Sequence, residues 1–175
     1  AAWDFINSQE QKNMTMTTIH PGLVLGPLLS NDIDGASADI MNKLITGKFP
    51  GNPNLNFTLV DVRDVALLHV KAISSAESNG KRCLTTSEDY LHMSELSSIL
   101  RVGGYKKAPS KNIPNFIVKF LALFSSEMKG VARNLDRKYK ADISETISLF
   151  NWKPIEIKKT ILDMAESVQN ILEKK

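Results

Sequence analysis

The chain has 175 residues, of which 42% are hydrophobic and 23% charged. This composition is enough for one packed domain and argues against a disordered chain. A net charge of +3 is too small to predict nucleic-acid binding, and we interpret the two basic stretches, 101–111 and 133–140, as solvated surface.

A single cysteine, Cys83, excludes an internal disulfide and suits a reducing compartment. Its apolar neighbours predict a buried strand residue, and a reactive thiol is the weaker alternative. The three histidines show no metal-ligand spacing with it, so we predict no metal site. The apolar run 116–124 is broken by Lys119 and is too short to span a bilayer, which takes roughly 20 residues. We therefore expect a cytoplasmic protein without a membrane partner.

The first residues predict a helix and then a strand. Residues 1–11 have the pattern of the last turns of an amphipathic helix, and no capping residue precedes them. This leads us to expect further sequence upstream. The β-branched stretch 15–20 predicts a strand that stops at Pro21.

A loop over 26–35 leads into the next predicted elements. Periodic apolar residues predict a helix over 36–46 that ends at Gly47. Residues 57–60 are a predicted short strand, and Asp61 has the position of a helix N-cap directly after it. One face of the helix that follows carries Val62, Ala66, Val70 and Ile73.

The second half is mostly helical. A strand is predicted at 82–85 and a helix at 93–101. The helix predicted over 113–124 is apolar on nearly every side, so we expect it to be buried or to cover a cavity. Capping-box spacing at 142–145 begins a short helix that 151–154 breaks. The last helix carries Ile157, Ile161, Met164, Ala165, Val168 and Leu172 on one face.

This order predicts an α/β region followed by a mostly helical cap. Only about three strands are visible. Parallel strands need cover on both faces and neighbours at their edges. We therefore expect these strands to complete a sheet that begins on other polypeptide.

Three stretches in register carry a family resemblance. Ile19–Pro27 contains a Pro-x-x-Val-x-Gly-Pro pattern, and residues 57–70 contain Val-Asp-Val-x-Asp-Val-Ala. Residues 149–154 are similar to Leu-Gly-Trp-x-Pro, with Asn151 in place of the glycine. These motifs resemble the carboxy-terminal portion of extended short-chain dehydrogenases/reductases, of the dihydroflavonol-reductase and epimerase–dehydratase type. Ala1–Trp3 resembles the segment directly after the Tyr-x-x-x-Lys helix in that family.

The resemblance implies the carboxy-terminal part of a Rossmann-type parallel sheet with a helical substrate-binding cap. Residues 1–30 and 57–76 would complete the sheet, and residues 31–56 and 81–175 would form mainly the cap. The implied activity is NAD(P)H-dependent reduction of a ketone or aldehyde, with NADP slightly favoured over NAD. A small carbonyl compound is the expected substrate, and a homodimer is left open.

The resemblance also assigns site residues. Pro21, Gly22 and Leu23 follow a strand's carboxyl end, where open α/β sheets bind ligands, and would lie beside the nicotinamide. A simple strand-ending turn is the alternative. Leu28 and Leu29 would belong to a flap over the substrate, or to a variable surface loop.

The catalytic groups of the family are not in this sequence. Tyr90, Tyr105 and Tyr139 each lack a lysine four residues on, and no G-x-x-G-x-x-G pattern occurs. We therefore predict no catalytic residue, an inactive chain when alone, and a missing amino-terminal half as its partner. The alternatives are a non-catalytic cofactor-sensing or protein-interaction module of the same fold and, less favoured, a small helical interaction protein. Titration with NADPH and NADH discriminates between them.

Several polar residues have a structural interpretation. We expect Asp61 and Asp64 to cap the helix and form a salt bridge rather than act as an acid–base pair. We expect Arg63 to be solvent-exposed, with contact to an acidic partner as the less favoured alternative. Trp152 is predicted to pack in the core beside Pro154.

Overall fold

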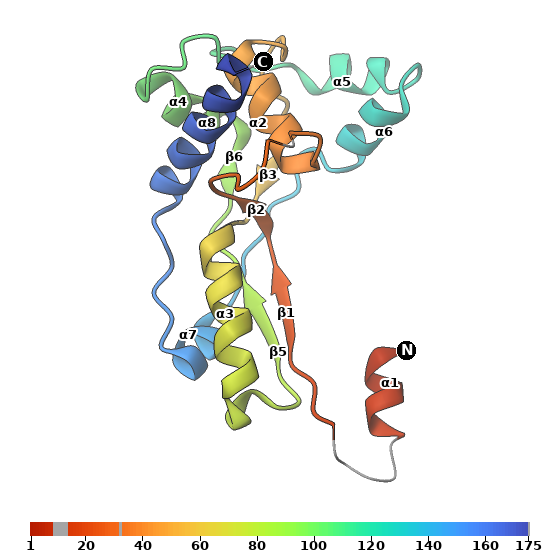
Figure 1. Cartoon of the computed structure of the whole chain (residues 1–175). Coiled ribbons are helices and arrows are strands. Elements are labelled where there is room, and N and C mark those ends of the chain that lie inside the picture. Colours follow the sequence, from red (N-terminus) through yellow and green to blue (C-terminus); the bar gives the residue numbers. More distant parts are fainter. Residues whose placement is uncertain (9–13, 32, 175) are drawn as a thin grey trace.

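The computed structural model describes residues 1–8, 14–31 and 33–174. Residues 9–11 of the predicted first helix therefore lie outside the described residues. The helices and strands follow one another in the order α1 (Ala2–Asn7), β1 (Thr18–Pro21), β2 (Leu23–Leu25), α2 (Ala36–Thr46), β3 (Asn56–Phe57), β4 (Leu59–Asp61), α3 (Val62–Ser74), β5 (Arg82–Thr85), β6 (Leu91–His92), α4 (Met93–Val102), α5 (Asn115–Leu121), α6 (Ser126–Arg133), α7 (Ser144–Phe150) and α8 (Ile157–Glu173) (Figure 1).

The described strands form three pairs. β1 lies parallel to β5, β2 lies parallel to β4, and β3 and β6 form a short antiparallel pair. Each of these strands thus has one neighbour, and the outer edges of the parallel pairs have no partner within the described residues. This agrees with the expectation of an incomplete parallel sheet.

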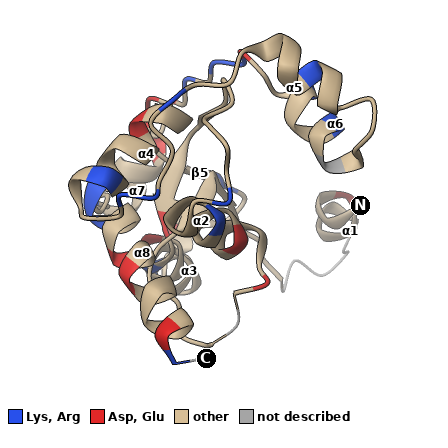
Figure 2. Ribbon diagram, turned by 90° about the horizontal axis from the view of Figure 1, so that it is seen from above, with Lys and Arg blue, Asp and Glu red and all other residues tan. Residues whose placement is uncertain are grey.

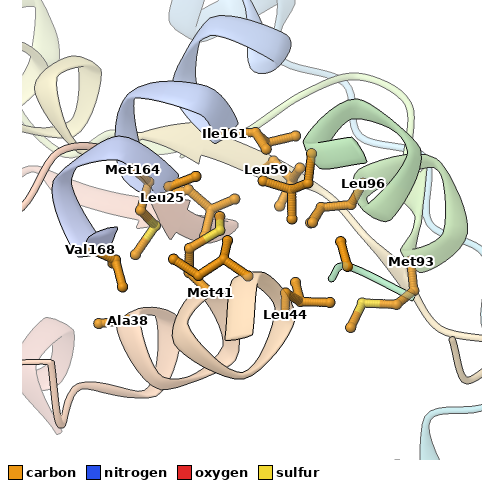
Figure 3. Close-up of a cluster of buried hydrophobic side chains, with 14 residues drawn as sticks. Leu25, Ala38, Met41, Leu44, Leu59, Met93, Leu96, Ile161, Met164 and Val168 are labelled. Atoms are coloured by element: carbon orange, nitrogen blue, oxygen red, sulfur yellow. The ribbon is translucent and has the colours of Figure 1, made fainter. Parts of the chain in front are cut away.

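The larger of two cores lies where α2, α4 and α8 pack around β2 and β4 (Figures 1 and 3). Leu44, Leu100 and Ile161 are completely buried there. The periodic apolar faces predicted for the helices at 36–46, 93–101 and 157–173 are confirmed, because their residues supply most of this core. Gly47 ends α2 in the left-handed conformation that favours glycine, with φ at 78°.

The smaller core lies between α3, α7 and the strands β4 and β5. It consists of Val60, Leu68, Cys83, Ile143, Phe150 and Trp152. The predictions that Cys83 is a buried strand residue and that Trp152 packs in the core are confirmed. Burial also raises the pKa of the Cys83 thiol, which makes it a poorer nucleophile.

Two strand predictions need correction. The strand predicted at 57–60 is two strands, because the chain changes its pairing partner at Thr58. Before Thr58, β3 pairs with β6, and after it, β4 pairs with β2. The strand predicted at 15–20 begins only at Thr18, where pairing with β5 starts. The pattern also missed β2, which continues the chain directly after Gly22.

Of the two alternatives predicted for the helix at 113–124, burial is wrong. The observed helix, α5, ends at Leu121 and packs on α6, while Phe116, Phe120, Leu123 and Phe124 are each at least 60% exposed. Figure 2 shows α5 and α6 as an arm that extends away from α2, α3 and α8. An apolar helix is buried only when other chain segments reach it, and few segments reach this arm.

The predicted apolar face of α3 is also largely exposed. Val62, Val70 and Ile73 are 39%, 65% and 89% exposed, and α3 buries Asp64 and Leu68 instead. The helix predicted after 142–145 is present as α7, but the predicted capping box does not form. The N-cap is Ile143, Asp142 accepts hydrogen bonds from Ser144, and Glu145 accepts one from Lys81. Within the described residues, no helix is long and apolar enough to cross a membrane.

Candidate functional site: the strand crossing at Gly22 and the pocket beside it

At Gly22 the chain passes from one parallel strand pair to the other. The Gly22 amide donates to the Thr85 carbonyl over 3.0 Å, and the Leu23 amide donates to the Thr58 carbonyl over 2.8 Å. A Cβ at Gly22 would lie 2.2 Å from Thr86 Oγ1 and 2.5 Å from the Thr58 oxygen. Only glycine therefore lets the two strand pairs approach each other here.

The structure brings Pro21, Gly22 and Leu23 together at this crossing. Pro21 ends β1 and is exposed, while Leu23 begins β2 and is half-buried. These positions lie at the carboxyl end of β1, the edge where parallel α/β sheets bind ligands. Thr86 Oγ1, beside Gly22, is buried without a hydrogen-bond partner in the described part of the chain.

Leu23 also lines a pocket of about 400 Å³. One wall is the segment from Leu55 to Thr58, and the other is α6 with the irregular segment that follows it. The remaining lining residues are Gly130, Val131, Asn134 and Tyr139. The pocket is thus directly continuous with the strand crossing through Leu23 and Thr58.

One asparagine joins the two walls of this pocket, and another caps the helix in one of them. Asn56 Nδ2 donates to the Arg137 carbonyl over 2.7 Å, which ties the strand wall to the segment after α6. Asn134 Nδ2 donates to the Gly130 carbonyl over 2.9 Å and so closes the end of α6. Asn54 and Asn115 both donate to Asp136, at the base of the α5–α6 arm.

Leu28 and Leu29 lie elsewhere. Leu28 lines a second pocket, of about 350 Å³, between the loop after β2, the start of α2 and Met164 of α8. Its amide donates to Ser167 Oγ over 2.9 Å. The side chain of Leu29 is fully exposed. The structure therefore does not bring these two leucines to the pocket that Leu23 lines.

Asp61 and Asp64 have the structural roles predicted for them. Asp61 Oδ1 accepts a hydrogen bond from the Arg63 amide at the start of α3, and Asp64 Oδ2 accepts one from the Ile155 amide. Burial raises the pKa of Asp61, but hydrogen bonds from Arg63 and Thr160 outweigh it, so the net pKa lies below its usual value. An aspartate that stays ionised in this way is a poor general acid.

The Arg63 side chain is 38% exposed and also contacts acidic groups, which was the less favoured alternative. Its guanidinium contacts Asp61 and Asp163, at 2.6 and 2.8 Å, and both carboxylates raise its pKa. The pairing was not visible in the sequence because Asp163 lies on α8, far along the chain.

Sequence reasoning missed the pocket residues outside the motifs. Asn56, Val131, Asn134 and Tyr139 fall in stretches without a family pattern, and their meeting depends on how the arm folds back. Gly130 offered one signal, since a glycine inside a helix is uncommon. Among the described residues, no group of three His, Cys, Asp or Glu side chains is placed to hold a metal ion.

No protein-family model matches the chain. Individual relatives do. A cinnamoyl-CoA reductase of Medicago truncatula is 41% identical over 101 residues, which cover 58% of this chain and 29% of that protein. A Candida albicans protein described as an NADPH-dependent methylglyoxal reductase is 27% identical over 177 residues, covering 96% of this chain and 47% of that protein.

Solved structures show the same fold. Yeast methylglyoxal/isovaleraldehyde reductase complexed with NADPH matches 98% of this chain and 52% of its own, with a TM-score of 0.73 and 23% identity. A UDP-glucose 4-epimerase of Thermotoga maritima matches 98% of this chain and 50% of its own, with a TM-score of 0.68 and 16% identity. The chain thus spans about half the length, or less, of the proteins that it matches.

The fold is therefore that of Rossmann-type α/β reductases and epimerases, with parallel strand pairs and many helices. Within this class, the relatives described as reductases and the solved reductases and epimerases are the kinds of protein that the motif resemblance predicted, and the chain matches part of their fold. The resemblance seen in its motifs is confirmed.

Proposed function

We propose that this chain is the substrate-side half of an NADPH-dependent reductase of ketones or aldehydes. The nucleotide-binding half and the proton donor would lie on further polypeptide. In this proposal the chain alone is inactive, because its sequence has neither a Gly-rich pyrophosphate loop nor a Tyr-x-x-x-Lys pair.

One observation carries the proposal: a pocket opens directly beside the strand crossing at Gly22. Ligands of open α/β sheets bind at the carboxyl ends of the strands, where the sheet changes direction. Leu23 belongs both to this crossing and to the pocket. A cofactor at the crossing and a substrate in the pocket would therefore lie next to each other.

The names of the relatives support the reaction class and the cofactor. The proteins of Medicago and Candida are described as reductases, and the Candida protein as NADPH-dependent. Crystal structures of two reductases with this fold contain NADPH. We therefore propose NADPH as the cofactor of this protein and a small carbonyl compound as its substrate.

The residues of the chain fit one wall of a cofactor site. Pro21, Gly22 and Leu23 would contact the nicotinamide end, because Pro21 is exposed at the strand end and Leu23 faces the pocket. NADPH would supply the hydride. Leu28 and Leu29 would act from the loop after β2, at the edge of the substrate region.

The proposed division of the chain follows from this arrangement. Residues 1–30 and 57–76 would complete the nucleotide-binding sheet, and residues 31–56 and 81–175 would form mainly the substrate cap. β5 lies in the range 81–175, but it pairs with β1 and is therefore part of the sheet. A homodimer and cytoplasmic placement remain parts of the proposal.

The test compares the 175-residue chain with the longest polypeptide that its gene encodes. We expect NADPH oxidation with an aldehyde such as propanal only in the longer polypeptide. Leu23→Ala should lower kcat/KM for the aldehyde roughly tenfold, since an apolar pocket contact is worth about that factor. Val102→Ala, on the exposed end of α4, is the control.

Two results would overturn the reductase proposal. One is NADPH binding by the longer polypeptide without turnover of any aldehyde or ketone, which indicates a cofactor sensor. The other is turnover by the chain alone, because that requires a proton donor other than the family's tyrosine.

A further inference from the structure

The arm formed by α5 and α6 exposes large apolar side chains. Phe116, Phe120, Leu123 and Phe124 are 72%, 60%, 69% and 76% exposed. The rings of Phe120 and Phe124 pack edge to face with their centroids 5.5 Å apart, so they form one surface. Figure 2 shows that this arm projects from the rest of the molecule. Apolar patches that stay exposed in this way mark contacts with another protein or with a membrane.

The charge of the chain is divided unevenly, and the arm lies in its basic part. Residues 96–126 contain five Lys or Arg residues and no Asp or Glu. The rest of the chain has the other 17 of the 22 basic residues and all 19 acidic ones, a net charge of −2. Figure 2 shows Lys and Arg on the arm, and Asp and Glu on α2, α4 and α8. The apolar surface is therefore suited to an anionic partner.

Lys119 distinguishes between the partners that could cover this surface. It is exposed and lies within the apolar run of α5, directly before Phe120. Lysine is depleted from the centre of protein–protein contacts, and a two-fold contact between copies of the arm brings two such charges together. At a membrane surface, the lysine stem lies along the apolar region while the ammonium group reaches the lipid headgroups. A lipid surface therefore fits better than a second copy of the chain.

We propose that the α5–α6 arm binds the surface of an anionic membrane. The exposed phenylalanine and leucine side chains enter the boundary between headgroups and acyl chains, and the basic residues contact the anionic headgroups. The expectation of no membrane partner rested on an apolar run that is too short to span a bilayer. Binding at the surface requires no spanning helix. The inference does not depend on the proposed reductase activity.

Vesicle flotation tests the proposal with the longest polypeptide that the gene encodes, so that any companion half is present. The vesicles contain phosphatidylcholine alone, or phosphatidylcholine with about one quarter phosphatidylserine. We expect the polypeptide to bind the anionic vesicles at least tenfold more tightly than the neutral ones. High salt should weaken this binding, because it screens the attraction between the basic residues and the headgroups.

Two pairs of variants separate the apolar from the electrostatic contribution. Phe120→Ser combined with Phe124→Ser should weaken binding to the anionic vesicles at least tenfold, because two apolar groups no longer enter the membrane. Val102→Ser, at a position 75% exposed on α4, should change it less than twofold. Lys119→Glu should weaken it at least fivefold, since one basic residue near an anionic membrane is worth about that factor. Lys153→Glu makes the same change of charge at an exposed position before α8 and should have less than a twofold effect.

Four results would overturn the proposal. Two are absence of binding to the anionic vesicles and equal binding to the neutral ones. A third is a concentration-dependent dimer that the double phenylalanine variant abolishes, which assigns the arm to a second copy of the chain. The fourth is binding by the 175-residue chain but not by the longer polypeptide, which shows that a companion half covers the arm. Thermal unfolding checks that each variant is folded, and Phe116→Ser replaces the double variant if that variant unfolds.

Discussion

The carboxylate of Asp61 joins three elements of the chain. It ends β4, caps the first turn of α3 and accepts a hydrogen bond from Thr160 Oγ1 of α8 over 2.7 Å. Its side chain is completely buried, and Arg63 binds both of its oxygens. A buried carboxylate with this many donors is stable only while it stays ionised.

Asp61→Asn should destabilise the chain by roughly 2 kcal/mol, because the new amide group faces the donors of Arg63 and Thr160. Urea unfolding measures the loss. Asp39→Asn is the control: Asp39 pairs with Lys43 at the surface of α2, where an exposed pair contributes less than about 0.5 kcal/mol. Equal losses for the two variants would contradict the role given to Asp61.

The lowered pKa of Asp61 makes the stability of the folded chain depend on pH. The pKa of Asp61 in the folded chain is lowered, so the unfolded chain binds the proton more readily. The stability that the ionised group provides is therefore complete above about pH 4, the ordinary pKa of aspartate, and is lost as the pH falls further toward the folded-state pKa. Unfolding measured between about pH 5 and pH 3 should show a shallower loss for Asp61→Asn than for the unchanged chain.

At the scale of elements, two glycines differ in the space around them: a Cβ at Gly22 would clash with its neighbours, and a Cβ at Gly130 would meet no other atom within 4 Å. Gly130→Ala should stabilise the chain by about 0.5–1 kcal/mol, because α6 gains a better helix former and no contact is disturbed. Gly22→Ala should destabilise it by roughly 1–3 kcal/mol, since the strand pairs must move apart to admit the new Cβ. Urea midpoints that move in the same direction would show that the strand crossing is not as tightly packed as described.

The errors of prediction at this scale share a cause. Periodicity located α2, α4 and α8 correctly because these helices bury one face against neighbours within the chain. The same reasoning placed α5 in the interior and gave α3 a buried face of Val62, Val70 and Ile73, which the structure exposes. An apolar pattern reports that a face is suited to burial. It does not report whether the covering segment is present.

At the scale of the whole molecule, two surfaces are those that the proposed companion half would cover: the exposed apolar face of α3 and the edge of β1 that has no partner among the described residues. Val70→Lys should change the stability of the 175-residue chain by less than about 0.5 kcal/mol, since Val70 is 65% exposed. In the longest polypeptide that the gene encodes, the same change should cost about 2 kcal/mol or more, because a charge then enters a packed interface. Equal effects in both would argue against a companion half that covers α3.

The sequence by itself determined the class of fold, most helix positions, the burial of Cys83 and Trp152, and the absence of a Tyr-x-x-x-Lys pair. These features depend on neighbouring residues or on one residue type, so a local pattern is sufficient to read them. The tertiary structure decided the change of strand partner at Gly22, the pairing of Arg63 with Asp163, and the pocket between Phe57 and Gly130. Each of these joins segments far apart in the chain, and only the path of the folded backbone determines which of them meet.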